Sequence, residues 1–122
     1  MENPALKLIA EKKEDSPWTG YMIHRENEVV GQCAFKYPPK NGKVEIAYYT
    51  YGEFQGEGIA TEACRQLVVK ALATDPTVKI TARTLPEKNS STRILEKNNF
   101  RMIGEVIDEE DGHVWEWMYE AP

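Results

Sequence analysis

The sequence predicts one α+β domain over residues 1–122, within the broad α/β class, in which helices flank a mixed sheet. A chain of 122 residues suits a single domain of ordinary size. Hydrophobic residues make up 41% and charged residues 29%, the balance of a folded globular protein rather than a disordered chain. Segments with the two-residue period of strands alternate along the chain with segments of helical period, so both kinds of element share one core.

The first predicted element is a short helix. Asn3-Pro4 has the form of an N-cap followed by a first-turn proline. The helix would reach about Lys13, and Asp15-Ser16-Pro17 would end it. Its apolar face would be formed by Ala5, Leu6, Leu8 and Ile9.

Three strands follow this helix. Residues 18–24 and 29–36 are joined by the polar turn 25–28, which predicts an antiparallel hairpin. The loop at 37–42 contains Pro-Pro and Asn-Gly, two dipeptides that break regular structure. A third strand is predicted from residue 43 to about residue 51.

The next predicted elements are a helix at about 58–74 and a strand at 78–84, separated by Asp75-Pro76. The helix keeps the spacing of one buried face, formed by Ile59, Ala60, Ala63, Leu67, Val68, Ala71 and Leu72.

The chain closes with a further helix and two strands. Ser90 or Ser91 would cap the helix, which would end near Asn98-Asn99. Ile94 and Leu95 would face inward. The strands are predicted at 101–107 and 114–119.

Composition restricts the partners and the compartment. The net charge of −5 argues against nucleic acid, since phosphate backbones need a clustered basic surface. Cys33 and Cys64 lie in apolar stretches and are too few for a disulfide framework or a zinc site, so we expect buried thiols in a reducing compartment and no metal. No apolar run has the length of a membrane span, and no signal peptide is evident. We therefore expect a cytoplasmic protein that binds no membrane.

The strongest functional signal is a glycine-rich turn between a strand and a helix, Gln55-Gly56-Glu57-Gly58-Ile59-Ala60-Thr61. Glycines let successive N–H groups converge, and the helix dipole adds positive potential, so a pyrophosphate fits there. A tight structural turn is the alternative interpretation. The turn has neither the G-x-G-x-x-G of dinucleotide-binding folds nor the lysine of a P-loop.

Two motifs in order resemble the GNAT superfamily of acetyltransferases. Gln55-x-x-Gly58-x-Ala60 is similar to its acetyl-CoA pyrophosphate loop, and Thr61-Glu62-Ala63 resembles the branch that includes the ribosomal-protein N-terminal acetyltransferases. Residues 85–100 are similar to the Pro-Glu-Asn-x-x-Ser-x-Arg-Val-Leu-Glu-Lys-x-Gly-Phe of the same branch. Residues 44–49 match the strand before the loop, so the resemblance extends over about 29–119.

The resemblance implies a mostly antiparallel sheet with one splayed strand pair that holds acetyl-CoA. Backbone groups of Tyr48, Tyr49 and Thr50 would bond the pantetheine arm. Asn89, Ser91 and Lys97 would form the opposite wall. Backbone N–H groups of the loop would hold the pyrophosphate: Gln55, Gly56, Glu57, Gly58, Ile59, Ala60 and Thr61.

The implied reaction moves an acetyl group from acetyl-CoA to a primary amine, which needs a base and a proton for the thiolate. Glu45 is the candidate base, with an ordinary solvent-facing carboxylate as the alternative. Ser91 is the candidate partner of the thiolate, with a helix N-cap as the alternative.

Three departures from the family pattern bear on activity. Lys88 stands where the family has asparagine, and Leu95 stands where some relatives carry a tyrosine general acid. The helical region at the N-terminus is shorter than the pair of helices that often roofs the acceptor site, so the cleft would be open or completed by a second subunit in a homodimer.

The acceptor amine is left open among a protein N-terminus, a lysine, a polyamine, an amino acid and an antibiotic amine. The alternative function is a non-catalytic acyl-CoA-binding or regulatory module.

Overall fold

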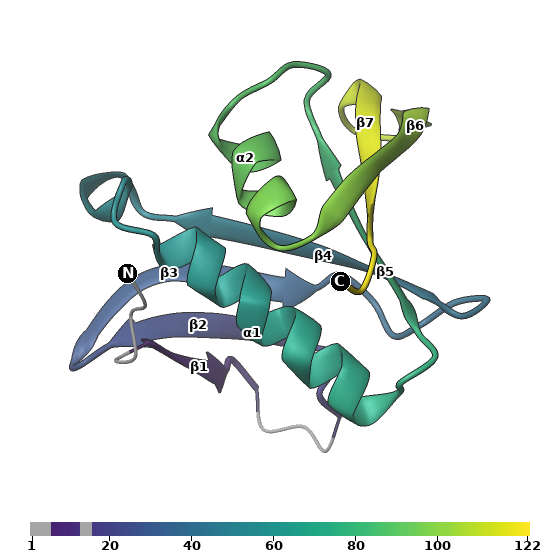
Figure 1. The fold of residues 1–122 in the computed structure, drawn as a ribbon. Coiled ribbons are helices and arrows are strands. Elements are labelled where there is room, and N and C mark those ends of the chain that lie inside the picture. Colours follow the sequence, from purple (N-terminus) through teal and green to yellow (C-terminus); the bar gives the residue numbers. More distant parts are fainter. Residues whose placement is uncertain (1–5, 13–15) are drawn as a thin grey trace.

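The computed structural model describes residues 6–12 and 16–122. Its seven strands form one sheet in the order β1-β2-β3-β4-β5-β7-β6, with two α-helices packed against it (Figure 1). The elements are β1 (Leu6–Ala10), β2 (Gly20–Arg25), β3 (Glu28–Phe35), β4 (Lys43–Thr50), the short 3₁₀ turn η1 (Gly52–Phe54), α1 (Ile59–Thr74), β5 (Lys79–Thr84), α2 (Ser90–Lys97), β6 (Phe100–Asp108) and β7 (Gly112–Tyr119).

The sheet is mixed, because β4 and β5 are parallel while every other neighbouring pair is antiparallel. The parallel ladder contains three residue pairs and ends at Glu45↔Thr81. Beyond that point β5 turns toward β7 and β4 continues alone on that side, so a gap opens between them (Figure 1). The predicted fold class and its splayed strand pair are confirmed.

The predicted N-terminal helix is wrong for the residues that can be compared. Leu6–Ala10 is strand β1, which pairs antiparallel with β2 from Leu6↔Arg25 to Ala10↔Tyr21. Leu6 is buried and Leu8 half-buried while Lys7 is exposed, so the two-residue period decides over the helical one. A strand needs backbone hydrogen-bond partners on a neighbouring strand, and the edge of β2 supplies them. The rest of the predicted helix, at 3–5 and 13, lies outside the described residues.

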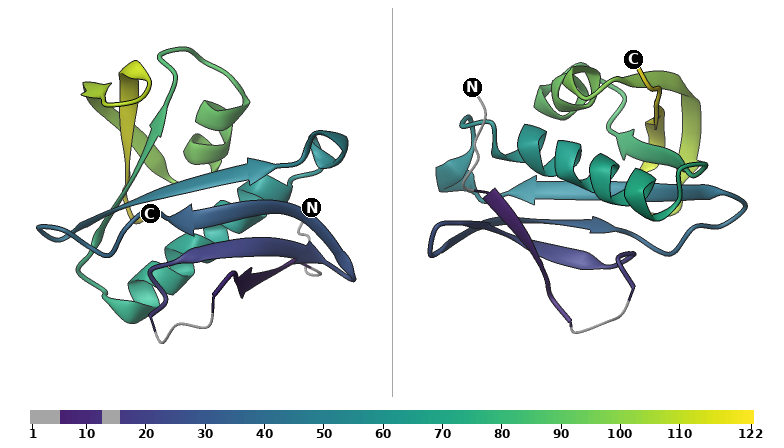
Figure 2. Two further views of the ribbon diagram at one scale, coloured as in Figure 1. Left: turned by 180° about the vertical axis from the view of Figure 1, so that it is seen from behind. Right: turned by 60° about the horizontal axis from the view of Figure 1, so that its bottom comes forward.

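The remaining predicted elements are confirmed within about three residues. Helix α1 buries one face on the sheet through Ile59, Ala63, Cys64, Leu67, Val68 and Ala71. Figure 2 shows α1 and α2 on the same side of β2–β4, and no helix among the described residues covers the opposite face. Cys33 and Cys64 are free and buried, and burial raises the pKa of each thiol to about 12, as expected for core residues.

Gly31 in β3 allows a close approach to β4. A Cβ at this position would overlap the Tyr49 carbonyl oxygen and lie 3.1 Å from Cα of Thr50 and 3.3 Å from Cδ1 of Ile23. Because two of these neighbours are backbone atoms of β4, they cannot move aside without displacing that strand.

We expect Gly31→Ala to lower the free energy of unfolding by about 1–3 kcal/mol, since it overpacks the β3–β4 contact. Denaturation in urea measures this value. The matched control is Gly104→Ala in β6, where an added Cβ meets nothing within 4 Å and the change should stay within about 0.5 kcal/mol. Equal losses for the two variants would contradict the assignment of a close approach.

Candidate functional site

A cavity of about 460 Å³ lies where the gap between β4 and β5 meets the N-termini of α1 and α2. Three segments contribute its walls: the end of β4, the stretch from η1 through the first turn of α1, and one face of α2. The lining residues are Tyr48, Tyr49, Thr50, Phe54, Gln55, Gly56, Gly58, Ile59, Ala60, Thr61, Ser90, Ser91, Arg93, Ile94 and Lys97.

The N-terminus of α1 is open toward this cavity. Gly58 is the N-cap with φ 80°, and Gly56 has φ 83°, a left-handed conformation that side chains disfavour. No side chain caps the helix, and a Cβ at either glycine would meet nothing within 4 Å. The first turn of a helix carries N–H groups without intrahelical acceptors and a positive dipole end. The turn is therefore able to bind an anion such as a phosphate.

The exposed edge of β4 supplies polar backbone groups. Lys36 N donates to Glu45 O and Tyr51 N to Val30 O, so these odd-numbered positions of β4 and its extension bond to β3. Strand alternation then turns the backbone groups of Tyr48 and Thr50 into the gap, and those of Tyr49 toward β3.

Thr50 also marks a place that a ligand can complete. Its Oγ1 is buried and has no hydrogen-bond partner within the part of the chain that the structure describes. Its carbonyl accepts a 3.0 Å bond from Gln55 Nε2, which ties the glycine-rich loop to the end of β4. Buried polar atoms are normally paired, so an orphaned hydroxyl beside the cavity fits a polar ligand atom.

The opposite wall is one face of α2. Ser90, Arg93, Ile94 and Lys97 recur at three- and four-residue spacing and all line the cavity, with two cations among them. Sequence reasoning placed only Lys97 of these four in the site, although helical spacing from Lys97 would have found the others. Phe54 was also missed, because η1 has no clear sequence signal.

Asn89 does not line the cavity, contrary to expectation. It is the N-cap of α2: its Oδ1 accepts from Thr92 N at 3.1 Å, and its own N donates to Thr92 Oγ1 at 3.0 Å. This capping box corrects the predicted cap at Ser90 or Ser91, which instead begin the helix. Ser91 is thereby left to line the cavity.

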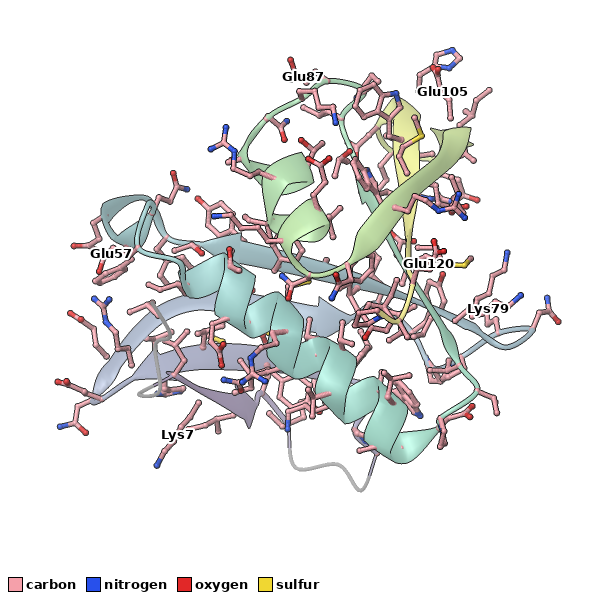
Figure 3. All side chains as sticks on the ribbon, in the orientation of Figure 1. Lys7, Glu57, Lys79, Glu87, Glu105 and Glu120 are labelled. Atoms are coloured by element: carbon pink, nitrogen blue, oxygen red, sulfur yellow. The ribbon has the colours of Figure 1, made fainter. Side chains whose placement is uncertain are left out.

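Glu57 is the other residue expected to bind the cofactor that lies outside the lining of this cavity. Its Oε1 accepts a 2.6 Å hydrogen bond from Arg25 Nη1, across 32 residues of sequence. Figure 3 labels Glu57 on the loop before α1, at the end of the molecule where the β2–β3 turn lies. The Arg25 guanidinium also lies 5.4 Å from the ring centre of Phe54, which does line the cavity. Arg25 thus neutralises the carboxylate of Glu57 near the anion site and contacts Phe54 in the cavity wall.

A second, smaller pocket of about 110 Å³ adjoins the first. It contains Glu45, and it shares Tyr48 and Ser91 with the larger cavity. The Glu45 side chain is only 8% exposed and lies 2.8 Å from Lys36 Nζ, so it is not the solvent-facing carboxylate of the alternative interpretation. The Tyr48 hydroxyl donates to the Ser91 carbonyl oxygen at 3.3 Å, and burial raises the pKa of Tyr48, which keeps its proton in place.

A sequence model of the acetyltransferase (GNAT) domain matches residues 3–101. The chain belongs to the GNAT acetyltransferase family. Two curated relatives are uncharacterized N-acetyltransferases: YjdG of Bacillus subtilis, 28% identical over 100 residues, and p20 of Bacillus licheniformis, 29% identical over 90 residues. These matches cover 80% and 73% of the chain, and 56% and 51% of the relatives. The chain therefore spans about half the length of the curated relatives that it matches.

Solved GNAT structures share the fold. A GNAT acetyltransferase from Bacillus anthracis superposes with a TM-score of 0.70 at 20% identity, over 81% of this chain and 64% of that one. Mycobacterium smegmatis RimJ, solved with a CoA disulfide, superposes with a TM-score of 0.74 at 23% identity, over 82% of this chain and 51% of RimJ. RimL, a ribosomal L7/L12 α-N-protein acetyltransferase solved with coenzyme A, superposes with a TM-score of 0.70 at 20% identity, over 82% of this chain and 60% of RimL. The predicted resemblance to this superfamily is confirmed.

We expect Arg25→Ala to weaken acetyl-CoA binding roughly fivefold, because Glu57 is released toward the anion site at the N-terminus of α1. Calorimetric titration measures the affinity. Adding Glu57→Gln to Arg25→Ala should restore most of it by removing the released charge. Acetyl-pantetheine, which has no pyrophosphate, should bind all variants alike. A double variant no better than Arg25→Ala alone would contradict this role for the pair.

Proposed function

We propose that the chain is an acetyl-CoA-dependent N-acetyltransferase that moves an acetyl group to a primary amine by direct attack on the thioester. The observation that carries this proposal is the cavity at the β4–β5 gap. Its lining joins an uncapped helix N-terminus to an unpaired strand edge that ends at Thr50, whose buried hydroxyl has no partner among the described residues. An elongated ligand with a phosphate end and an amide-containing arm matches these three features in order.

The residues present fit acetyl-CoA. The α1 N-terminus, at Gly56 and Gly58 through Thr61, would hold the pyrophosphate with its N–H groups. Arg93 and Lys97 would supply positive charge from α2. Backbone groups of Tyr48 and Thr50 would bond the pantetheine amides, with the Thr50 hydroxyl as a further partner. In this arrangement the thioester lies near Tyr48 and Ser91, where the two pockets meet.

The chemistry then uses the smaller pocket. Glu45 would accept a proton from the amine, whose nitrogen attacks the thioester carbon. The new C–N bond forms as the C–S bond breaks, and the CoA thiolate leaves. Ser91, at the junction of the pockets, would donate a hydrogen bond to that thiolate, while the Tyr48 hydroxyl donates to the Ser91 carbonyl oxygen and holds that residue in place.

The uncovered face of the sheet bears on the acceptor cleft, and the cysteines bear on the cellular compartment. Since no helix among the described residues covers the face of β2–β4 opposite α1, we propose an open acceptor cleft, or one completed by a second copy in a homodimer. The free buried thiols favour a reducing compartment, and we propose the cytoplasm. None of the helices in residues 6–12 and 16–122 is long and apolar enough to cross a membrane.

We expect Gly58→Leu to weaken acetyl-CoA binding by at least about tenfold, the equivalent of ~1.4 kcal/mol, because its side chain would enter the pyrophosphate site. Calorimetry on folded protein measures this loss. The matched control is Gly42→Leu, which has nearly the same φ of 77° and the same open surroundings in a loop outside the cavity. Both variants carry the same backbone strain, so equal affinities would remove the pyrophosphate assignment.

We expect Glu45→Gln to lower kcat by about 10²–10⁴-fold while leaving acetyl-CoA affinity intact, since it removes a general base but no cofactor contact. Thiol release with a panel of primary amines, followed across pH, measures this. Glu105→Gln, an exposed carboxylate 3.2 Å from His113 on the outer strands, should retain full rate. An unchanged pH–rate profile would mean that the base lies elsewhere. Acetyl-CoA binding without thiol release in the unmodified protein would instead support the non-catalytic module.

A further inference from the structure

The amine of Lys36 occupies the smaller pocket, next to the proposed base. Its Nζ lies 2.8 Å from Glu45 Oε2, and its backbone N donates to the Glu45 carbonyl oxygen at 2.9 Å. The backbone contact fixes the position of Lys36 directly after β3, and the ion pair places its Nζ beside Glu45. Lys36 therefore holds a primary amine where an external acceptor would have to place its own.

The smaller pocket leads to the proposed thioester. It is lined by Lys36 and Glu45 at one end and by Tyr48 and Ser91, which it shares with the larger cavity, at the other. The Lys36 side chain is 45% exposed, so it has room to swing along the gap while Glu45, at 8%, stays fixed.

We propose that Lys36 is an internal acetyl acceptor, so that the protein acetylates itself at this residue. This proposal rests on the proposed function. In the step, the neutral Nζ attacks the thioester carbon of bound acetyl-CoA, a C–N amide bond forms, the C–S bond breaks, and the thiolate leaves with the electron pair. The resting ammonium first passes one proton through Glu45 to water, which leaves the neutral amine. During or after the attack the nitrogen gives a second proton to Glu45, and that proton passes to the thiolate.

The charges around Lys36 make this reaction slow but directed. Burial acts to lower the pKa of Lys36, but the hydrogen bond and charge of Glu45 and the charge of Asp108 outweigh both burial and the nearby Arg83. The pKa of Lys36 therefore lies above its ordinary value, and the ammonium is the resting form. Few molecules are deprotonated at any moment, while Glu45 keeps the side chain aimed into the pocket. We expect a single turnover over minutes to hours rather than rapid modification.

Lys40 is the natural comparison within the same loop region. It lies four residues beyond Lys36, with its Nζ 4.9 Å from the ring centre of Tyr37, and it lines neither of the two pockets. The two lysines meet the same acetyl-CoA in solution, so chemical acetylation labels both. Proximity to the bound thioester would favour Lys36 alone.

Acetylation of Lys36 would remove the positive charge that lies next to Glu45, the proposed base. An acetylated Lys36 is neutral and cannot pair with Glu45 as an ammonium does. The pocket would then hold an amide beside an unpaired carboxylate.

The experiment incubates the purified protein with isotope-labelled acetyl-CoA and follows labelled acetyl groups on Lys36 and Lys40 by peptide mass spectrometry. Acetyl-CoA binding is measured by calorimetry on the same samples. We expect Lys36 to be labelled at least about tenfold faster than Lys40, at a rate per molecule that does not depend on protein concentration. Gly58→Leu should reduce Lys36 to the rate of Lys40, and Glu45→Gln should slow Lys36 without affecting Lys40. Lys40→Arg should leave the labelling of Lys36 unchanged.

Binding of acetyl-CoA with Lys36 labelled no faster than Lys40, or equally fast in Gly58→Leu, would overturn this inference and leave the proposed function standing. An absence of binding would overturn the proposed function, and the inference with it.

Discussion

Strands β4 and β5 share a parallel ladder of three residue pairs and then separate, and the functional surface depends on that separation. Strand β5 is drawn aside by its four pairs with β7, from Thr81↔Met118 to Thr84↔Trp115. The far half of β4 is left with backbone groups that face no strand. Unpaired backbone groups inside a protein are costly, so this edge favours a ligand able to bond with it. The Tyr48 hydroxyl spans the gap to the Ser91 carbonyl and links β4 to α2.

Charge is distributed so that an acidic protein keeps an anion site. The net charge is −5, yet the cavity is lined by Arg93 and Lys97 and by no acidic side chain from residues 6–12 and 16–122. Glu57, the carboxylate within the glycine-rich turn, is held by Arg25. Glu62 in the first turn of α1 bonds Arg65, which lowers the pKa of that carboxyl. The field at the helix N-terminus is thus shielded from the chain's own negative charge.

Local patterns were enough to predict most of this arrangement. The amphipathic period of α1, the hairpin turn and the two motifs led to the fold, the family and most of the cavity lining. The failures have physical causes. Five residues of β1 carry too few periods to separate strand from helix, and the partner strand decided. Asn89, Ser90 and Ser91 are all good caps, and only the bonds to Thr92 select Asn89. The pairs Arg25–Glu57 and Lys36–Glu45 join distant segments, so no local pattern reveals them.

The most direct test of the account is the change in backbone amide NMR shifts when acetyl-CoA is titrated into the labelled protein. The account predicts the largest shifts at Gly56 through Thr61 and at Tyr48 and Thr50, with little change at the β6–β7 end. Shifts concentrated outside the β4–β5 gap, or none at saturating acetyl-CoA, would contradict the claim that this gap is the cofactor site.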